Sequence, residues 1–331
     1  MGSVRPRTIA GYRTDEHHIT AAIGSVRPDR LRPEHIERLW HHMIDQGLTV
    51  PHCRRTLSAA LNDAVRRGAL MRNPISYADA PAHAESEIEP YTVEQMSLLL
   101  TTARETRNAT RWTLAMALGL RQGEVLGLCW DDLELPSDPD REGTFVIRRQ
   151  LQRLPWQHGC PEPPKCLNPA GLPAKRGADC PQRWGGGLKL SEPKSSAGRR
   201  TLTLPPTVAI ELRAHRRTQI AEQLASEVWQ SGPHGGWVFA NERGGPVDPR
   251  ADARNFKDLC RRSGVPPKRL HDLRHSAATM MLASDLDLRT AGAVLGHSQI
   301  ALTARYSHIL ADRRSVAASR IERTLFGNGT G

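Results

Sequence analysis

Long hydrophobic runs, lysines and aromatic side chains are scarce in this chain of 331 residues. No apolar run approaches the roughly 18 to 20 residues that a membrane-spanning helix needs. The N-terminal sequence MGSVRPRTIAGYR has no apolar core like that of a signal peptide. We therefore expect a cytoplasmic protein with no membrane partner. The sequence also has no internal repeat and no glycine-rich phosphate loop, which excludes solenoid folds and nucleotide sites of the P-loop kind.

Positive charge is in excess: the formal net charge is +11 and the isoelectric point is near 9.9. Clustered basic side chains release counterions when they bind nucleic acid, so the charge favours a polyanionic partner. Forty arginines stand against six lysines, a ratio that codon bias in a GC-rich gene would also produce. Because lysine is so rare, the setting of each one is informative.

The length suffices for two domains, each with its own core. Residues 1–82 form a helical unit, in which apolar periodicity with proline at the start and glycine at the end predicts helices over 33–47 and 49–68. The segment PAHAESEIEP has no apolar period and indicates a linker at 83–91. Thr92 and Gln95 form a capping box that opens the second domain, residues 92–331.

A polar stripe runs along the second of these helices. Arg55, Asn62 and Arg66 stand at i, i+7 and i+11, so they share one helical face. A solvated face is the simple interpretation. In so basic a chain we favour contact with DNA.

The segment GLRQGE, residues 119–124, follows a predicted buried helix. An acid three residues after an arginine can reach back and orient the guanidinium, so Glu124 is expected to hold Arg121. The alternative is a surface ion pair of little energetic value. The surrounding leucines and Val125 argue against it, because a charged pair among apolar side chains needs a reason to be there.

Residues 143–151, GTFVIRRQL, have strand composition. Residues 190–205 resemble two short strands joined by a turn, with Lys194 beside the turn. A lysine at a hairpin tip is usually only solvated, but no other lysine in the chain has this setting. Arg199 and Arg200 of the same segment are further candidates for DNA contact.

An insertion rich in glycine and proline occupies about residues 156–187 of the hairpin region. It carries four candidate metal ligands, because thiolates and imidazole suit a structural zinc ion. These are His158, Cys160, Cys166 and Cys180. The spacing of the cysteines is not that of a standard zinc finger, and a flexible loop with free thiols is the alternative.

The segment from His271 to Tyr306 holds the densest set of reactive side chains. His271 and Arg274 stand at i and i+3, on one face near the start of a helix, where backbone N–H groups favour an anion. His271 and His275 have the spacing of a zinc-protease histidine pair, but Arg274 places a cation between these two histidines. Core or capping histidines are the plain structural alternative.

Five motifs together resemble the tyrosine recombinase family, the phage and mobile-element integrases. They are GLRQGE (119–124), EPKS (192–195), HDLRHS (271–276), LGH (295–297) and YSH (306–308), in family order. The N-terminal helical unit, with its ending RRGALMRNP, is similar to the core-binding domain of the family. The insertion is longer than a minimal hairpin needs, and we expect no part of residues 1–331 to form a separate arm-binding domain.

The resemblance implies a mainly α fold with a small antiparallel β-sheet: a helical, SAM-like core-binding domain followed by a mixed α/β catalytic domain. It implies that Tyr306 attacks the scissile phosphate to form a 3′-phosphotyrosyl link, without a cofactor. Arg121 and Arg274 would clamp the phosphate, Lys194 would protonate the leaving oxygen, His271 would serve as general acid/base and His297 would donate a hydrogen bond. Glu124 and His275 would support them.

The implied partners are double-stranded DNA attachment sites, three further copies of the chain in a homotetramer on synapsed DNA, and an accessory directionality factor. The protein would be associated with the nucleoid and would serve integration or excision of a mobile element. Two other functions remain open. One is a type IB topoisomerase-like relaxing enzyme, and the other is a non-catalytic DNA-binding regulator.

Overall fold

The computed structural model describes residues 4–81, 89–138, 140–162, 165–193, 196–284 and 286–296. Contacts divide the chain into two compact units, residues 1–87 and 88–331, and each is described by itself. The division falls inside the segment predicted as a linker. Three predicted catalytic residues, Lys194, His297 and Tyr306, lie outside the described residues.

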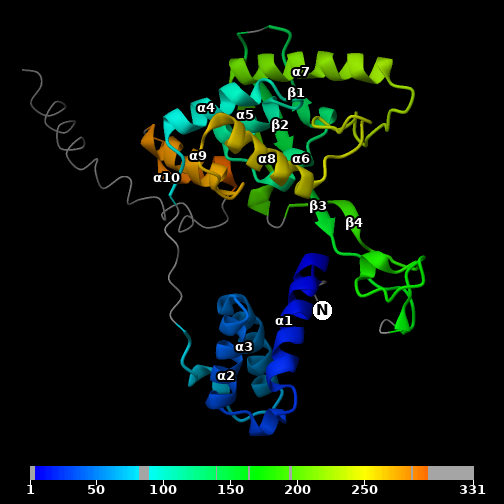
Figure 1. Cartoon of the computed structure of the whole chain (residues 1–331). Coiled ribbons are helices and arrows are strands. Elements are labelled where there is room, and N and C mark those ends of the chain that lie inside the picture. Colours follow the sequence, from blue (N-terminus) through cyan, green and yellow to red (C-terminus); the bar gives the residue numbers. More distant parts are fainter. Residues whose placement is uncertain are drawn as a thin grey trace, which may run out of the picture. The chain divides into compact units, whose positions relative to one another are not determined.

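Unit 1 is helical in its described part (Figure 1). Prolines at the first helical turn begin each α-helix, where the missing N–H costs no hydrogen bond. The two helices predicted over 33–47 and 49–68 are confirmed; a third, N-terminal one had no clear apolar period to reveal it. The elements are α1 (Pro6–Ile23), η1 (Pro28–Arg30), α2 (Pro33–Asp45), α3 (Val50–Arg66) and η2 (Pro74–Ser76). Their shared core includes Ile36, Trp40 and Leu57.

The described part of unit 2 is mainly helical with two small antiparallel sheets, as expected. Its α-helices are α4 (Val93–Ala103), α5 (Thr110–Leu118), α6 (Gln122–Leu126), α7 (Pro206–Ala225), α8 (Pro249–Ser263), α9 (Asp272–Ala283) and α10 (Leu288–Leu295). The predicted capping box of Thr92 and Gln95 begins α4. One core lies where α5 and α7 meet the larger sheet, and a second packs α4, α5, α8 and α9 together.

The strands are β1 (Leu133–Glu134), β2 (Gly143–Ile147), β3 (Gln150–Leu154), β4 (Gly187–Ser191) and β5 (Arg200–Leu204). One sheet has the order β1-β2-β5, and β3 pairs with β4 in the other. The predicted strand over 143–151 is therefore two strands. The predicted hairpin of β4 with β5 is wrong, because β4 returns to β3 and β5 returns to β2.

Arg148 and Arg149 are the two residues between β2 and β3, and both pair with Asp132. The side chain of Arg149 donates to the buried carboxylate of Asp132 at 3.0 Å, on the same face as the buried Phe145 and Ile147. The last pair of the larger sheet joins Ile147 to Arg200 and the first pair of the smaller sheet joins Gln150 to Ser191, so the connecting segments, 148–149 and 192–199, differ in length. Lys194 falls in that longer segment of the sequence. The paired strands β3 and β4 lead away from the body of unit 2 toward the insertion that connects them (Figure 1).

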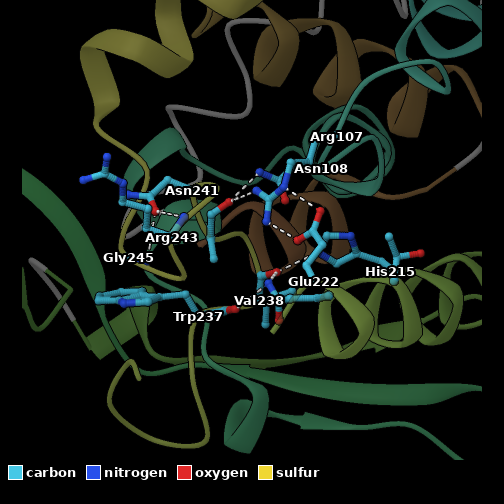
Figure 2. Close-up of polar contacts among 12 residues, drawn as sticks. Arg107, Asn108, His215, Glu222, Trp237, Val238, Asn241, Arg243 and Gly245 are labelled. Atoms are coloured by element: carbon cyan, nitrogen blue, oxygen red, sulfur yellow. Dashed lines mark hydrogen bonds and ion pairs between the residues drawn. The ribbon is translucent and has the colours of Figure 1, made fainter. Parts of the chain in front are cut away.

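A polar cluster fixes α7 to the turn after residue 236 (Figure 2). Arg107 forms an ion pair with Glu222 of α7, and Asn108 donates to the carbonyl of Ala240 at 3.0 Å. His215 of α7 contacts the carbonyl of Val238 at 2.7 Å. The segment predicted as a short strand or buried turn, residues 237–240, is thus a buried turn held by side chains. Among the described residues, no helix is both long and apolar enough to cross a membrane.

Candidate active site

Arg121 stands in a break between two helices. Helix α5 ends at Gly119, whose φ of +59° is left-handed, and Arg121 is the residue that caps α6. Glu124 accepts a hydrogen bond from the backbone N–H of Arg121 at 3.0 Å and from its Nη1 at 2.7 Å. The carboxylate therefore fixes both the backbone and the side chain of Arg121. Glu124 is 2% exposed, which excludes the simple surface ion pair.

Arg200 completes this cluster from β5. Its Nη2 lies 3.0 Å from Glu124, and its Nε donates to the carbonyl of Val294 in α10 at 2.7 Å. Burial alone would raise the pKa of Glu124, but hydrogen bonding and charge from Arg200, joined by Arg121, lower it below its ordinary value. Glu124 is therefore an anion shared by two guanidinium groups.

Arg274 is anchored by backbone carbonyls. This residue of α9 is 4% exposed, and it donates from Nη1 to Gly119 at 2.8 Å and from Nη2 to Leu295 at 2.6 Å. Gly119 has no room for a side chain, because a Cβ there would come within 2.5 Å of Leu295. The end of α5, the start of α9 and the end of α10 are thereby joined.

The same end of α10 receives Arg121. Its Nη2 donates to the carbonyl of Gly296 at 3.1 Å, next to the Leu295 carbonyl that Arg274 uses. Gly296, with φ of +67°, also lies against Arg200 and the carbonyl of Ala197, both too close for a Cβ. Two guanidinium groups and the segment that follows Lys194 thus meet immediately before His297 in the sequence.

His271 caps the start of α9, and its ring stands edge-on to that of His275, with centroids 4.9 Å apart. His271 is exposed to solvent, but one side of its imidazole packs against the ring of His275. Burial, and then the nearby His275, Arg274 and Arg121, lower the pKa of His271 to about 4. The imidazole is therefore neutral at pH 7 and can accept a proton. Because the charges of Arg274 and Arg121 both act on the pKa of His271, the imidazole lies close to the two guanidinium groups.

The structure thus brings together Arg121, Glu124, His271, Arg274 and His275 of the predicted catalytic set. Lys194, His297 and Tyr306 lie outside the described residues, so their roles stay predictions.

Four of the residues predicted to contact DNA are exposed. Arg55, Asn62 and Arg66 lie on α3, where Asn62 accepts a hydrogen bond from Asn73 and Arg66 pairs with Asp63. Arg199 pairs with Glu192 at 3.3 Å near the surface. Their contact with DNA stays a prediction.

Arg200 requires a correction. Its side chain is 8% exposed and donates to Glu124, Val294 and Gly198, so it faces the protein interior and does not present a surface to DNA. The alternation of β5 contained the signal: Arg200 shares a face with the buried Leu202 and Leu204. This positioning role was missed because Arg199 and Arg200 were treated together, as two neighbouring basic residues that both contact DNA.

The four candidate metal ligands converge in the insertion. The ligating atoms of His158, Cys160, Cys166 and Cys180 all lie within 4.8 Å of one another. Cys166 and Cys180 are buried, and the other two are partly buried. The arrangement suits a soft metal ion.

Comparison with known proteins identifies the family. Residues 202–313 match the Phage integrase family. An integrase from Saccharopolyspora erythraea is 36% identical, over 98% of this chain and 79% of the relative. A protein named tyrosine recombinase XerC-like, from Caldanaerobacter subterraneus subsp. tengcongensis, is 27% identical over 86% of this chain and 69% of its own.

The fold agrees with solved structures. The Tn1549 transposon integrase, in complex with a circular intermediate DNA, superposes with a TM-score of 0.69 at 18% identity, covering 92% of this chain and 90% of that one. A lambda integrase dimer on a core site gives a TM-score of 0.59. The chain belongs to the phage integrase family and is a tyrosine-type site-specific DNA recombinase.

Proposed function

We propose that this recombinase cuts and rejoins DNA through a 3′-phosphotyrosyl link to Tyr306. The observation that supports the proposal most strongly is the meeting of Arg121 and Arg274 at consecutive carbonyls, Gly296 and Leu295, directly before His297 in the sequence. Two fixed guanidinium groups suit a phosphate whose charge grows as a fifth oxygen attaches. Glu124 keeps one of them in place.

The reaction balances with side chains alone. The phenol oxygen of Tyr306 forms a bond to phosphorus as the bond to the 5′-oxygen breaks, and the electron pair leaves with that oxygen. His271, neutral at pH 7, takes the phenol proton, and Lys194 supplies a proton to the leaving 5′-oxygen. The bond energy is kept in the phosphotyrosine, so rejoining to another 5′-hydroxyl needs no nucleotide.

We further propose double-stranded attachment sites of a mobile element as the substrate. The net charge of +11 supports a polyanionic partner. Among the proteins of similar fold, the Tn1549 integrase was solved with DNA and lambda integrase as a tetramer bound to a Holliday junction. By analogy, the active form here is a homotetramer on synapsed DNA in the cytoplasm, associated with the nucleoid and directed by an accessory factor.

A nicked suicide substrate tests the proposal. The substrate carries the joined ends of the element, with a nick placed so that the released 5′-fragment diffuses away and the covalent adduct accumulates. Wild-type protein should form an adduct stable to denaturation. Tyr306→Phe should bind the same DNA and form none, while Tyr12→Phe, at an exposed tyrosine of α1, should behave as wild type. An adduct with Tyr306→Phe would refute the nucleophile.

The same preparation separates the alternatives. A relaxing enzyme would remove supercoils from a plasmid without paired sites, whereas a recombinase requires two sites to make product. A non-catalytic regulator would bind the substrate without any adduct. Relaxation without paired sites would overturn the requirement for two attachment sites, and binding without an adduct would overturn the phosphotyrosyl link.

A further inference from the structure

We propose that the insertion is a zinc-binding module, in which His158, Cys160, Cys166 and Cys180 hold one Zn²⁺. The module lies between β3 and β4 and contains none of the residues that we assign to strand transfer. Its metal would shape the protein and take no part in the chemistry on DNA.

The interatomic distances match a tetrahedral ion. With Zn–S bonds of about 2.3 Å and Zn–N bonds of about 2.0 Å, two sulfurs stand about 3.8 Å apart and a sulfur and a nitrogen about 3.5 Å apart. Here the Cys180 and Cys160 sulfurs are 3.8 Å apart, and Cys160 Sγ lies 3.7 Å from His158 Nδ1. The whole set fits within 4.8 Å, the size of one coordination sphere.

Disulfide bonding does not explain the cluster. A disulfide needs sulfurs about 2.05 Å apart, and Cys160 and Cys180, like the chain's other cysteines, are free thiols. Three thiols gathered around one point also leave one without a partner however they pair. A shared cation accounts for all three, and for the imidazole beside them.

The described residues of the insertion form only a very small buried cluster, which cannot by itself hold the segment in place. Its buried cluster consists of Cys166, Ala174 and Cys180, with Cys160 packed against it. Larger apolar side chains of the segment point to solvent instead: Leu167, Leu172 and Trp184 are each more than half exposed. So small a core cannot offset the conformational entropy lost when the segment is ordered. Small segments of this kind are commonly stabilised by a bound metal ion.

Two isolated β-bridges bring the segments that carry the ligands close together. Gln157 pairs with Trp184, which brings the His158 side of the loop to the Cys180 side, and Leu167 pairs with Pro173 beside Cys166. Gly159 passes so close to the carbonyl of Gln182 that a Cβ would lie 1.9 Å from it. The backbone is therefore folded tightly around the four ligating atoms.

The donor set selects the ion. Three thiolates and an imidazole favour Zn²⁺ over Ca²⁺ or Mg²⁺, which take oxygen ligands. Four protein ligands fill a tetrahedral shell and leave no position for a water or a substrate, which is the mark of a structural site.

Metal analysis of the full-length protein, purified without added chelator, tests the site. We expect about one zinc per chain by elemental analysis. Replacement by Co²⁺ should give thiolate-to-cobalt charge-transfer bands and the strong visible absorption of tetrahedral cobalt. Protein without stoichiometric zinc that also fails to give this spectrum on cobalt titration would overturn the proposal, as would a stoichiometric metal other than zinc.

Matched variants locate the metal. Cys180→Ser and Cys166→Ser should each lose most of the zinc, and His158→Ala should weaken its retention against a competing chelator. Cys53→Ala, at a buried cysteine of unit 1, should retain one zinc. A ligand variant that keeps full zinc occupancy would refute the assignment. The cobalt spectrum of the wild-type protein tests the metal site even if a variant fails to fold. The adduct assay with the suicide substrate tests the role of Tyr306 separately.

Discussion

Arg121 and Arg274 donate hydrogen bonds to consecutive carbonyl oxygens, those of Gly296 and Leu295, although Arg121 caps α6 and Arg274 lies on α9. Each is also held from a second side, Arg121 by Glu124 and Arg274 by the carbonyl of Gly119. Groups fixed before the reaction lose little reorganisation energy when charge develops on a phosphate. The end of α10 thus positions both guanidinium groups. Residues that fix this end of the helix should therefore affect the reaction rate more than the affinity for DNA.

Arg200 provides the first prediction. Arg200→Ala removes the partner that shares Glu124 with Arg121, so the guanidinium of Arg121 should shift, and the single-turnover rate of adduct formation should fall about 10- to 100-fold. DNA affinity should stay near wild type, because the Arg200 side chain is buried. Fluorescence anisotropy for binding and quenched-flow gels for adduct formation measure the two quantities.

The neighbouring Arg199 is the control for this variant. Its side chain is exposed, so Arg199→Ala should weaken DNA binding and reduce its salt dependence, while the rate at saturating DNA holds. Arg200→Lys should recover part of the lost rate. If Arg200→Ala instead weakened binding and left the saturated rate unchanged, Arg200 would be a DNA contact as the sequence first suggested.

Gly119 provides the second prediction. Gly119→Ala adds a methyl group to a residue at φ +59° and places it 2.5 Å from Leu295, whose carbonyl holds Arg274. Left-handed strain costs about 1 to 2 kcal/mol and overpacking about 1 to 3 kcal/mol more. We expect both a lower urea midpoint and a reduced adduct rate.

Gly264→Ala separates strain from overpacking. Gly264 has a similar φ of +69° but no atom within 4 Å of the added methyl group. It should show the strain cost alone and keep the adduct rate. Equal stability losses in the two variants would mean that the close contact with Leu295 carries no energy.

The pKa of His271 provides the third prediction. In the folded protein it is lowered to about 4, so in an NMR titration of the imidazole this histidine should stay neutral down to about pH 5. Arg121→Met removes a positive charge that opposes protonation and should raise the pKa above 4, while burial, the largest cause, still keeps it below the ordinary value. Arg216→Met, which removes a guanidinium stacked on Trp130, should leave it near 4.

The lowered pKa of His271 also makes the stability of the folded protein depend on pH. As pH falls below about 6.5, the unfolded chain binds a proton at His271 before the folded one does, so this residue lowers stability between about pH 6.5 and 4 and contributes nothing above that window. The adduct rate should fall as pH approaches 4, because the protonated imidazole cannot act as a base. A pKa near 6.5 in the wild type would contradict the assignment.

Motif spacing predicted which side chains lie together better than it predicted the elements that position them. Glu124 was expected to orient Arg121, and it does so, but as part of a helix cap, because Gly119 ends the preceding helix. The β4–β5 hairpin was wrong because local turn composition carries no information on which distant strand completes the ladder. The pairings of β3 with β4 and of β2 with β5 join segments that are distant in the sequence, and no local pattern reveals them.

A buried ion pair between α5 and α8 provides the last prediction. Arg111 of α5 and Asp252 of α8 are paired through 2.6 and 2.5 Å hydrogen bonds and are almost fully buried, and Gln122 also donates to Asp252 at 2.8 Å. Asp252→Ala leaves a guanidinium uncompensated in the interior, which should cost about 3 to 5 kcal/mol of unfolding free energy in urea.

Asp258→Ala is the comparison for this pair, because its ion pair with Arg261 is exposed and should be worth about 1 kcal/mol or less. Replacing both buried partners, as Arg111→Met with Asp252→Leu, should restore most of the stability lost in Asp252→Ala, since no charge is then stranded. A double variant as unstable as the single one would show that the pair's hydrogen bonds, and not the unpaired charge, determine how α5 and α8 pack behind Arg121.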